Sequence, residues 1–108
     1  MTESLPSTAV VRVSPGSFDP SRYAEIDALA RKQAEYLIPA IKQLSGLLRW
    51  YTGVSPDGSI VNISVWDSEE HAVQMSQLKE MAVIARGEME ALGVKFSPIV
   101  NDPIIWTI

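Results

Sequence analysis

The sequence contains no cysteine and only one histidine, His71. Without cysteine the chain has no disulfide, no thiolate nucleophile and no thiolate ligand for a metal. A lone histidine also rules out a metal site built from several histidines of one chain. We therefore expect no metal site.

The sequence also lacks a long apolar run and an excess of positive charge. No stretch of about 18 consecutive apolar residues is present, so a membrane-spanning helix is not expected. The formal net charge is -4 and the nine lysines and arginines are scattered, so a nucleic-acid partner is not expected either. Residues 1–6 have neither the basic start nor the apolar centre of a signal peptide, and we expect a cytoplasmic location.

The length of 108 residues fits one domain. We take residues 1–108 as this domain and expect residues 1–7 to form a flexible tail. Thr8 to Val13 has the composition of a strand. Ser14 to Ser17 consists of turn residues and should end that strand.

A long amphipathic helix is predicted after this turn. Asp19 can cap it, and Pro20 fits its first turn, where a backbone N–H has no partner to lose. Pro39 removes one backbone hydrogen bond, so we expect a kink or a local end after Leu37, with Gly46 closing the segment. Apolar residues recur at helical spacing: Tyr23, Ile26, Ala30, Leu37, Ile41 and Leu44.

Two strands, Leu47 to Gly53 and Ser59 to Trp66, are predicted to form an antiparallel hairpin around the turn sequence Pro56-Asp57-Gly58. Asp67, with Glu70 three positions later, predicts the start of a second long helix.

The second helix is predicted to end at Gly93. Lys95 to Val100 and Pro103 to Ile108 are rich in β-branched and aromatic residues and should form the fourth strand, with a bend at residues 101–103. The apolar stripe of the helix consists of Met75, Leu78, Ala82, Ala85, Met89 and Leu92.

The predicted order of strand, helix, strand, strand, helix, strand is typical of the ferredoxin-like fold. We therefore predict an α+β domain with a four-stranded antiparallel βαββαβ sheet and two helices on one face. The other face would expose apolar residues that no element of the chain is left to cover, which is not expected of a monomer. We predict an obligate homodimer whose two sheets form a dimeric α/β barrel, with residues 104–108 reaching across.

Strict alternation between Ile60 and Asp67 gives the predicted third strand two different faces. Val61, Ile63 and Val65 lie on one face, and Asn62, Ser64 and Trp66 lie on the other. A polar side chain held away from water without a partner costs about 1–3 kcal/mol. We infer that Asn62 and Ser64 serve a hydrogen-bond network or a ligand.

The segment Val61 to Glu70 resembles the antibiotic biosynthesis monooxygenase family within the dimeric α/β-barrel superfamily. The similarity lies in the pattern of Asn62, three residues, Trp66, an acid and Ser68, together with the same element order over the whole domain. Some members of that family oxidise polyketide anthrones to quinones without metal or flavin. The resemblance implies no cofactor, a homodimer, and a small aromatic molecule and dioxygen as further partners.

The resemblance also implies roles for individual residues. Asn62 and Trp66 are expected to line a pocket between the sheet and the helices, and Arg86 is the counterpart of an arginine on the second helix. The chain differs at Ala72, where those enzymes have a tyrosine. Haem-degrading relatives hold iron with a histidine in the later half of this helix, and residues 80–87 contain none, so haem binding is not expected.

His71 shares the helical stripe with Met75 and should point toward the sheet. It can accept a proton from the substrate, or it can bond a carboxylate or carbonyl at the helix start. Arg86 lies roughly 60° from the centre of the stripe and can reach either the cavity or solvent. Ser64, Met75 and Tyr23 are candidate substrate-binding residues, although Tyr23 and Met75 also suit the core.

Arg12 and Arg49 lie within predicted strands. They can face inward, but edge positions or ion pairs between subunits explain them equally well.

Three functions remain open at this level. The first is a cofactor-independent monooxygenase acting on a small planar aromatic or quinol-like compound, with Asn62, Trp66, Arg86 and His71 as catalytic residues. The second is a non-oxidative small-molecule-binding or polyketide-cyclase-like protein with the same pocket. The third is a dimeric domain without catalytic role, in which Asn62 and Ser64 satisfy each other.

Overall fold

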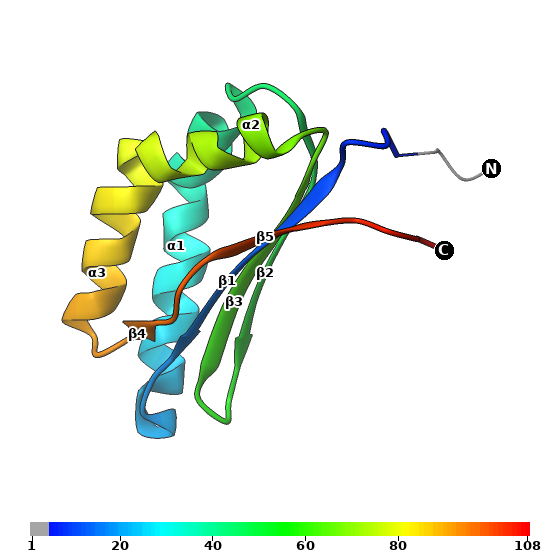
Figure 1. The fold of residues 1–108 in the computed structure, drawn as a ribbon. Helices are drawn as coiled ribbons and strands as arrows, with labels where there is room; N and C mark the ends of the chain where they lie inside the picture. Colours follow the sequence, from blue (N-terminus) through cyan, green and yellow to red (C-terminus); the bar gives the residue numbers. More distant parts are fainter. Residues whose placement is uncertain (1–4) are drawn as a thin grey trace.

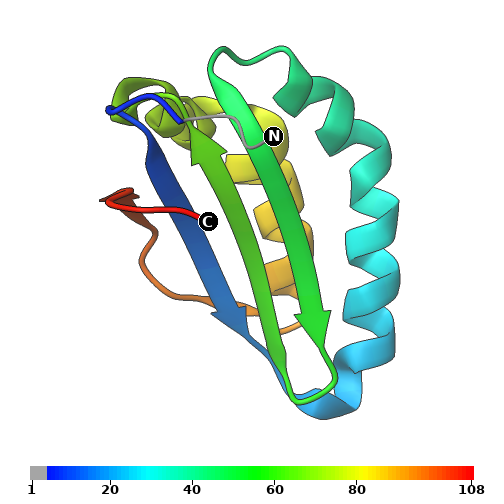
Figure 2. The same ribbon diagram turned by 90° about the vertical axis from the view of Figure 1, so that its right-hand side faces the viewer.

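The structure is a computed structural model that describes residues 5–108 (Figure 1). The tail expected for residues 1–7 lies mostly outside this range. The strands form one antiparallel sheet in the order β2-β3-β1-β4, and β5 also pairs with β1. All the helices cover one face of this open sheet, and the other face has no layer over it (Figures 1 and 2). The predicted ferredoxin-like α+β fold is confirmed, with the fourth strand divided into β4 and β5.

Strand β1 (Val10–Ser17) lies between β3 and the two C-terminal strands. The predicted turn at Ser14 to Ser17 is wrong, because these residues stay in register with β3 as far as the pair Ser17 and Ser59. Pairing with β3 outweighs the local preference of Pro15 and Gly16 for turns. β1 is therefore an internal strand, with β3 along its whole length on one side and β5 and β4 beside residues 10–13 and 16–17 on the other.

Asp19 caps the start of the first helical segment, as predicted. Its carboxylate accepts a hydrogen bond from the amide of Ser21 at 3.0 Å and opens a short 3-10 turn, η1 (Pro20–Arg22). Helix α1 (Tyr23–Lys42) follows without an end at Leu37, so the expectation of a local end there is wrong. Pro39 falls in the last turn and removes only one backbone hydrogen bond, the one to the carbonyl of Glu35. Glu35 is an exposed residue.

The hairpin of β2 (Leu47–Ser55) and β3 (Ser59–Trp66) is confirmed. The pairs Thr52 with Asn62 and Trp50 with Ser64 fix its register. Gly58 closes the turn at a φ of 102°, a conformation that favours glycine. β3 lies inside the sheet, between β2 and β1.

The second helical region is not the single long helix predicted. It consists of α2 (Glu69–Ala72), a 3-10 segment η2 (Val73–Gln77), a π-helical segment η3 (Glu80–Ala85) and α3 (Arg86–Ala91). The chain turns at Leu78, whose φ of -79° and ψ of 106° are extended. Figure 1 shows α2 lying across one end of the sheet while α3 runs beside α1.

The cap of α2 is Ser68 and not Asp67. The Ser68 hydroxyl accepts a hydrogen bond from the amide of His71 at 3.2 Å. Asp67 instead bonds the imidazole of His71. With the cap at Ser68, Glu69 and Glu70 lie in the first turn of α2. Acidic side chains there interact favourably with the helix dipole.

Strands β4 (Lys95–Phe96) and β5 (Val100–Pro103) both pair with β1. The predicted bend at residues 101–103 is wrong, because these residues belong to β5 and Asn101 pairs with Arg12. Residues 104–108 leave the sheet on the side away from the helices (Figures 1 and 2). Two of them, Ile105 and Trp106, are 88% and 73% exposed.

The core under the helices consists of two separate apolar clusters. One gathers around Trp66 and includes Ile41 and Met75. The other gathers around Ile26 and includes Ile60, Met89 and Val94, near the opposite end of the sheet. Because the two clusters are separate, space for a cavity remains between them, under the helices.

Candidate functional site

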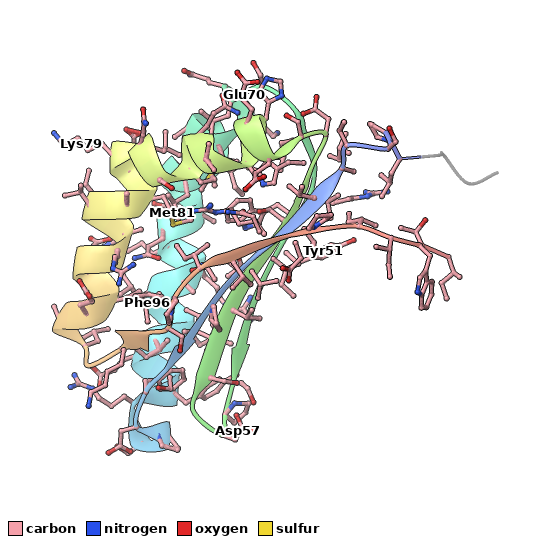
Figure 3. All side chains as sticks on the ribbon, viewed as in Figure 1. Tyr51, Asp57, Glu70, Lys79, Met81 and Phe96 are labelled. Atoms are coloured by element: carbon pink, nitrogen blue, oxygen red, sulfur yellow. The ribbon has the colours of Figure 1, made fainter. Side chains whose placement is uncertain are left out.

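A cavity of about 580 Å³ lies between the helical layer and the sheet. This volume is in the range of small-molecule sites, which is roughly 300–1,000 Å³. Its wall contains members of both apolar clusters, including Ile41, Met75, Ile60 and Met89. Figure 3 shows Met81, another wall residue, between the helices and the sheet.

Polar side chains cover the sheet side of this cavity. Ser14, Asn62 and Thr52 lie side by side on β1, β3 and β2, because Asn62 pairs with both of the others. Arg12 and Trp50 occupy the next helix-facing positions of β1 and β2, and both also line the cavity. The period of two along each strand accounts for this grouping.

The Asn62 amide is held in one orientation. The indole nitrogen of Trp50 donates to Oγ1 of Thr52 at 2.8 Å, and this hydroxyl donates to Oδ1 of Asn62 at 2.7 Å. The single hydroxyl hydrogen of Thr52 is therefore used, and the Asn62 carbonyl oxygen is occupied. Within residues 5–108 the Asn62 amide nitrogen has no hydrogen-bond acceptor, which leaves it as a donor toward the cavity.

Arg12 is the most deeply buried charged group of the cavity. The residue is only 7% exposed, and its Nη1 donates to Oδ1 of Asn101 at 3.4 Å. No carboxylate in the described part of the chain forms an ion pair with it. Burial lowers the pKa of Arg12, but an arginine keeps its charge at neutral pH.

The sequence left Arg12 undecided between an inward position and the sheet edge. The structure places Arg12 on an internal strand, because β5 pairs with β1 and Asn101 lies directly opposite Arg12. Arg49, considered with it, lies on β2 and is exposed.

The cavity wall is basic although the whole chain is acidic. Arg12, Lys42 and Arg86 line it, and among the described residues no aspartate, glutamate, histidine or tyrosine does. The formal net charge of the chain is -4. The cavity therefore favours an anionic ligand on electrostatic grounds.

Arg86 lies at the rim of the cavity. Its side chain is 42% exposed and its Nε is 3.5 Å from Oε2 of Glu90. The guanidinium also lies over the ring of Phe96, 5.0 Å from its centroid. Arg86 thus has both a cavity contact and partners of its own at the surface.

Trp66 and Ser64 lie beneath the cavity wall. Trp66 is fully buried and Ser64 is 2% exposed, and the indole nitrogen of Trp66 donates to the Ser64 hydroxyl at 2.8 Å. Neither residue lines the cavity. The indole that does so belongs to Trp50, and the alternation of β2, with Trp50 and Thr52 two residues apart, is the sequence signal that could have identified it.

The remaining predicted site residues are separated from one another. Met75 lines the cavity. His71 does not, and its Nδ1 lies 2.6 Å from Oδ1 of Asp67 in a partly exposed pair. Tyr23 packs against the apolar cluster around Ile26 and is also absent from the cavity wall.

A polar clasp joins α1 to α3 on the helical side. Gln33, which lines the cavity, donates to the carbonyl of Ala85 at 3.0 Å and to Glu88 at 3.2 Å. The Tyr36 hydroxyl donates to Glu88 at 2.5 Å. These bonds lower the pKa of the Glu88 carboxyl, and burial, followed by the bond to Glu88, raises the pKa of Tyr36. Sequence reasoning missed this clasp because its members lie more than fifty positions apart.

Within residues 5–108 no group of three or more histidine, aspartate or glutamate residues is arranged to hold a metal ion. The helices of that same range include none with the length and apolar character needed to span a bilayer.

Solved structures share this fold over nearly the whole chain. SnoaB, a cofactor-independent oxygenase from Streptomyces nogalater, is 18% identical with a TM-score of 0.64, and the match covers 94% of this chain and 97% of that one. A protein from Deinococcus radiodurans, provisionally assigned as an antibiotic biosynthesis monooxygenase, is 19% identical with a TM-score of 0.69, covering 92% and 95%.

A dimeric ferredoxin-like protein from an uncultured marine organism is 16% identical with a TM-score of 0.70, covering 94% of this chain and 91% of that one. The expected resemblance to antibiotic biosynthesis monooxygenases is thus confirmed at the level of the fold. No protein-family model matches the sequence, and the search of curated proteins found no match either.

Proposed function

We propose that this protein is a cofactor-independent monooxygenase that acts on a small planar aromatic or quinol-like compound in the cavity. The observation that carries the proposal is the oriented amide of Asn62, whose oxygen is bound by Thr52 while the residue faces a largely apolar space. A donor fixed in this way can stabilise negative charge on a substrate oxygen without reorganising. The fold shared with a cofactor-independent oxygenase supports the same conclusion.

In the proposed mechanism the substrate anion itself reduces dioxygen. A ring CH₂ group loses two hydrogens and gains one oxygen atom as a carbonyl, and the second oxygen atom leaves with the two hydrogens as water. The Asn62 amide donates to the substrate oxygen that carries the negative charge, at about 3 Å. The indole of Trp50 forms a flat wall for the ring, and Met75 a deformable one.

The proton of the substrate has no evident acceptor in the cavity. The described wall residues include no carboxylate, imidazole or phenol. We therefore assign no general base, and the substrate enters already ionised or loses its proton to solvent. In this proposal Arg86 is a charge partner at the rim, His71 belongs to the surface pair with Asp67, and Trp66, Ser64 and Tyr23 support the wall from behind.

We further propose that the protein acts as a homodimer joined through its open sheet face. By the alternation of the strands, this face presents Val13 of β1 and Ile63 of β3. Tyr51, which pairs with Ile63, is 58% exposed there and projects away from the helices (Figure 3). The exposed apolar residues of the C-terminal segment leave the sheet on this same side. A protein of the same fold is dimeric.

The second candidate is a non-oxidative small-molecule-binding or polyketide-cyclase-like protein. The observation that favours simple binding is the absence of a carboxylate, imidazole or phenol from the described cavity wall. Such a protein would use Asn62, Arg12 and the apolar wall for affinity alone.

Oxygen uptake separates the two candidates. Purified protein is mixed with anthrone in the presence of a chelator and without flavin. Uptake above autoxidation, with quinone formed and the rate lost in Asn62→Ala, supports the monooxygenase. Gln43→Ala, which removes an exposed amide outside the cavity, is the matched control. Ligand-induced thermal stabilisation without uptake supports the second candidate.

A further inference from the structure

We propose that the natural ligand carries a carboxylate group and that Arg12 binds this group at the sheet side of the cavity. The inference rests on the proposed function, because it names the substrate class of the same site. It goes further in assigning an acidic substituent separate from the reacting part of the ring.

The charge of Arg12 has no carboxylate partner in the described structure. Arg12 is only 7% exposed as a residue, and an arginine buried to this extent normally has such a partner. Here the only protein acceptor in the described structure is the neutral amide oxygen of Asn101, at 3.4 Å. No buried side-chain nitrogen or oxygen in residues 5–108 lacks a partner, so the other Arg12 nitrogens must be open to the cavity.

The Arg12 guanidinium has N–H groups that its single protein partner does not use. Arginine has five N–H groups in a planar fork, and Asn101 uses one of them. The remaining donors can bind the two oxygens of a carboxylate side by side. Asn101 comes from β5, which pairs with β1 at Arg12, so the sheet itself fixes the position of the guanidinium.

Arg12 and Asn62 lie close enough for one ligand to reach both. Arg12 pairs with Ser64 and Ser14 pairs with Asn62, so Arg12 and Asn62 are diagonal neighbours on adjacent strands. The backbone positions of such neighbours are about 7–8 Å apart. Both side chains line the same cavity, so the carboxylate of an aromatic ligand can meet Arg12 while an oxygen on another part of the ring meets Asn62.

The nearby carboxylates of the chain have partners other than Arg12. Glu88 is bound by Tyr36 and Gln33, and Glu90 lies beside Arg86 at the rim. Neither lines the cavity. Arg12 is therefore the one deeply buried cation of the described wall, and a single negative charge on the ligand would balance it.

Binding of matched ligands tests this inference. 2-Naphthoate and 2-naphthamide have the same shape, and only the first carries a carboxylate; 2-naphthol, neutral at pH 7, separates a hydroxyl from a carboxylate. Affinities are measured by calorimetry without oxygen. We expect the wild type to bind 2-naphthoate about 10- to 100-fold more tightly than either neutral compound, as for hydrogen bonds to charged groups.

The variant Arg12→Gln should remove this preference and keep the affinity for 2-naphthamide within about threefold, since the apolar wall is unchanged. Arg31→Gln, which changes an exposed arginine of α1 whose side chain is 79% accessible, should retain the preference. Equal affinities in the wild type, or a preference that survives Arg12→Gln, would overturn the inference. Should Arg12→Gln not fold, Arg12→Lys decides: the preference should fall because lysine lacks the fork, and a preference as large as in the wild type would overturn the inference.

The outcome is independent of the oxidative function. A preference for 2-naphthoate without oxygen uptake from any anthrone or quinol would remove the monooxygenase and keep the ligand class. Uptake with neutral substrates and no preference would remove the ligand class and keep the monooxygenase.

Discussion

The hydroxyl of Thr52 donates to Oδ1 of Asn62 at 2.7 Å, directly across the hairpin from it. The two residues are a cross-strand pair, so the backbone register that holds the hairpin together also aligns the hydrogen bond. The hydroxyl of Thr52 therefore fixes the orientation of the Asn62 amide and leaves its nitrogen as a donor toward the cavity.

Asn62→Ala should reduce the rate of oxygen uptake about 10²- to 10³-fold, because it removes the donor to the developing negative charge. The circular dichroism spectrum and the dimer should be unchanged, since the side chain lies on the cavity and not in the two apolar clusters. An unaltered rate in a folded Asn62→Ala protein would exclude the role assigned to this amide.

Thr52 is expected to act as a positioning residue through Asn62. Thr52→Val keeps the shape and removes the hydroxyl, so kcat should fall about tenfold with little change in KM, because one oriented bond is lost. Thr52→Ser restores the hydroxyl and should recover most of the rate. Equal rates for the two variants would show that the hydroxyl has no positioning role.

Arg12→Gln should raise the stability of the ligand-free protein, because a buried guanidinium without a carboxylate partner is costly. A gain of roughly 1 kcal/mol corresponds to about 4 °C in Tm for a domain of this size. Thermal unfolding measures the change, with Arg31→Gln as the surface comparison. A clear loss of stability in Arg12→Gln would instead assign Arg12 to the architecture of the sheet.

The clasp between α1 and α3 should give a pH-dependent contribution to stability. Tyr36 and Gln33 lower the pKa of Glu88 below its ordinary value of 4.5, so their bonds stabilise the fold above that pH and the contribution is lost as pH falls through the lowered value. Urea unfolding of Tyr36→Phe should show a deficit at pH 7 that shrinks at pH 3. Tyr23→Phe, whose hydroxyl makes no hydrogen bond in the described structure, should show the same small effect at both pH values.

The open sheet face should hold the homodimer together. Ile63→Lys places a charge at the centre of that face and should give monomers by sedimentation at micromolar concentration. Val83→Lys, at a residue of η3 that is 62% exposed on the helical layer, is the matched control and should stay dimeric. A wild type that sediments as a monomer at every concentration tested would reject the dimer.

The two faces of β3 could be predicted from sequence, because a period of two is a strong local signal. Asn62 faces the cavity as expected, whereas Trp66 shares its face but is buried in the apolar cluster that it forms with Ile41 and Met75. Which side chains of one face reach a cavity depends on how the helices pack over that face. This packing includes the turn at Leu78, which the continuous apolar stripe of residues 75–92 concealed.

The position of Arg12 depended on pairing distant in sequence. β1 is an internal strand because the C-terminal strands β4 and β5 pair with it, and the partner of Arg12 on β5 lies almost ninety residues later. The inward direction of Trp50 could instead be predicted from the alternation of β2. The family resemblance assigned the tryptophan of the pocket to Trp66, and Trp50 was therefore not considered.

The neighbours Asn62 and Ile63 point to opposite sides of one strand, and the turn of residues 56–58 sets the register of that strand. Because β1 also holds β3 in place, deleting a single residue from this loop would shift β2 by one position and exchange its side chains, turning Thr52 outward and Tyr51 inward. Changes in loop length should then be tolerated in pairs of residues and rejected singly, with binding and assembly lost in the same protein.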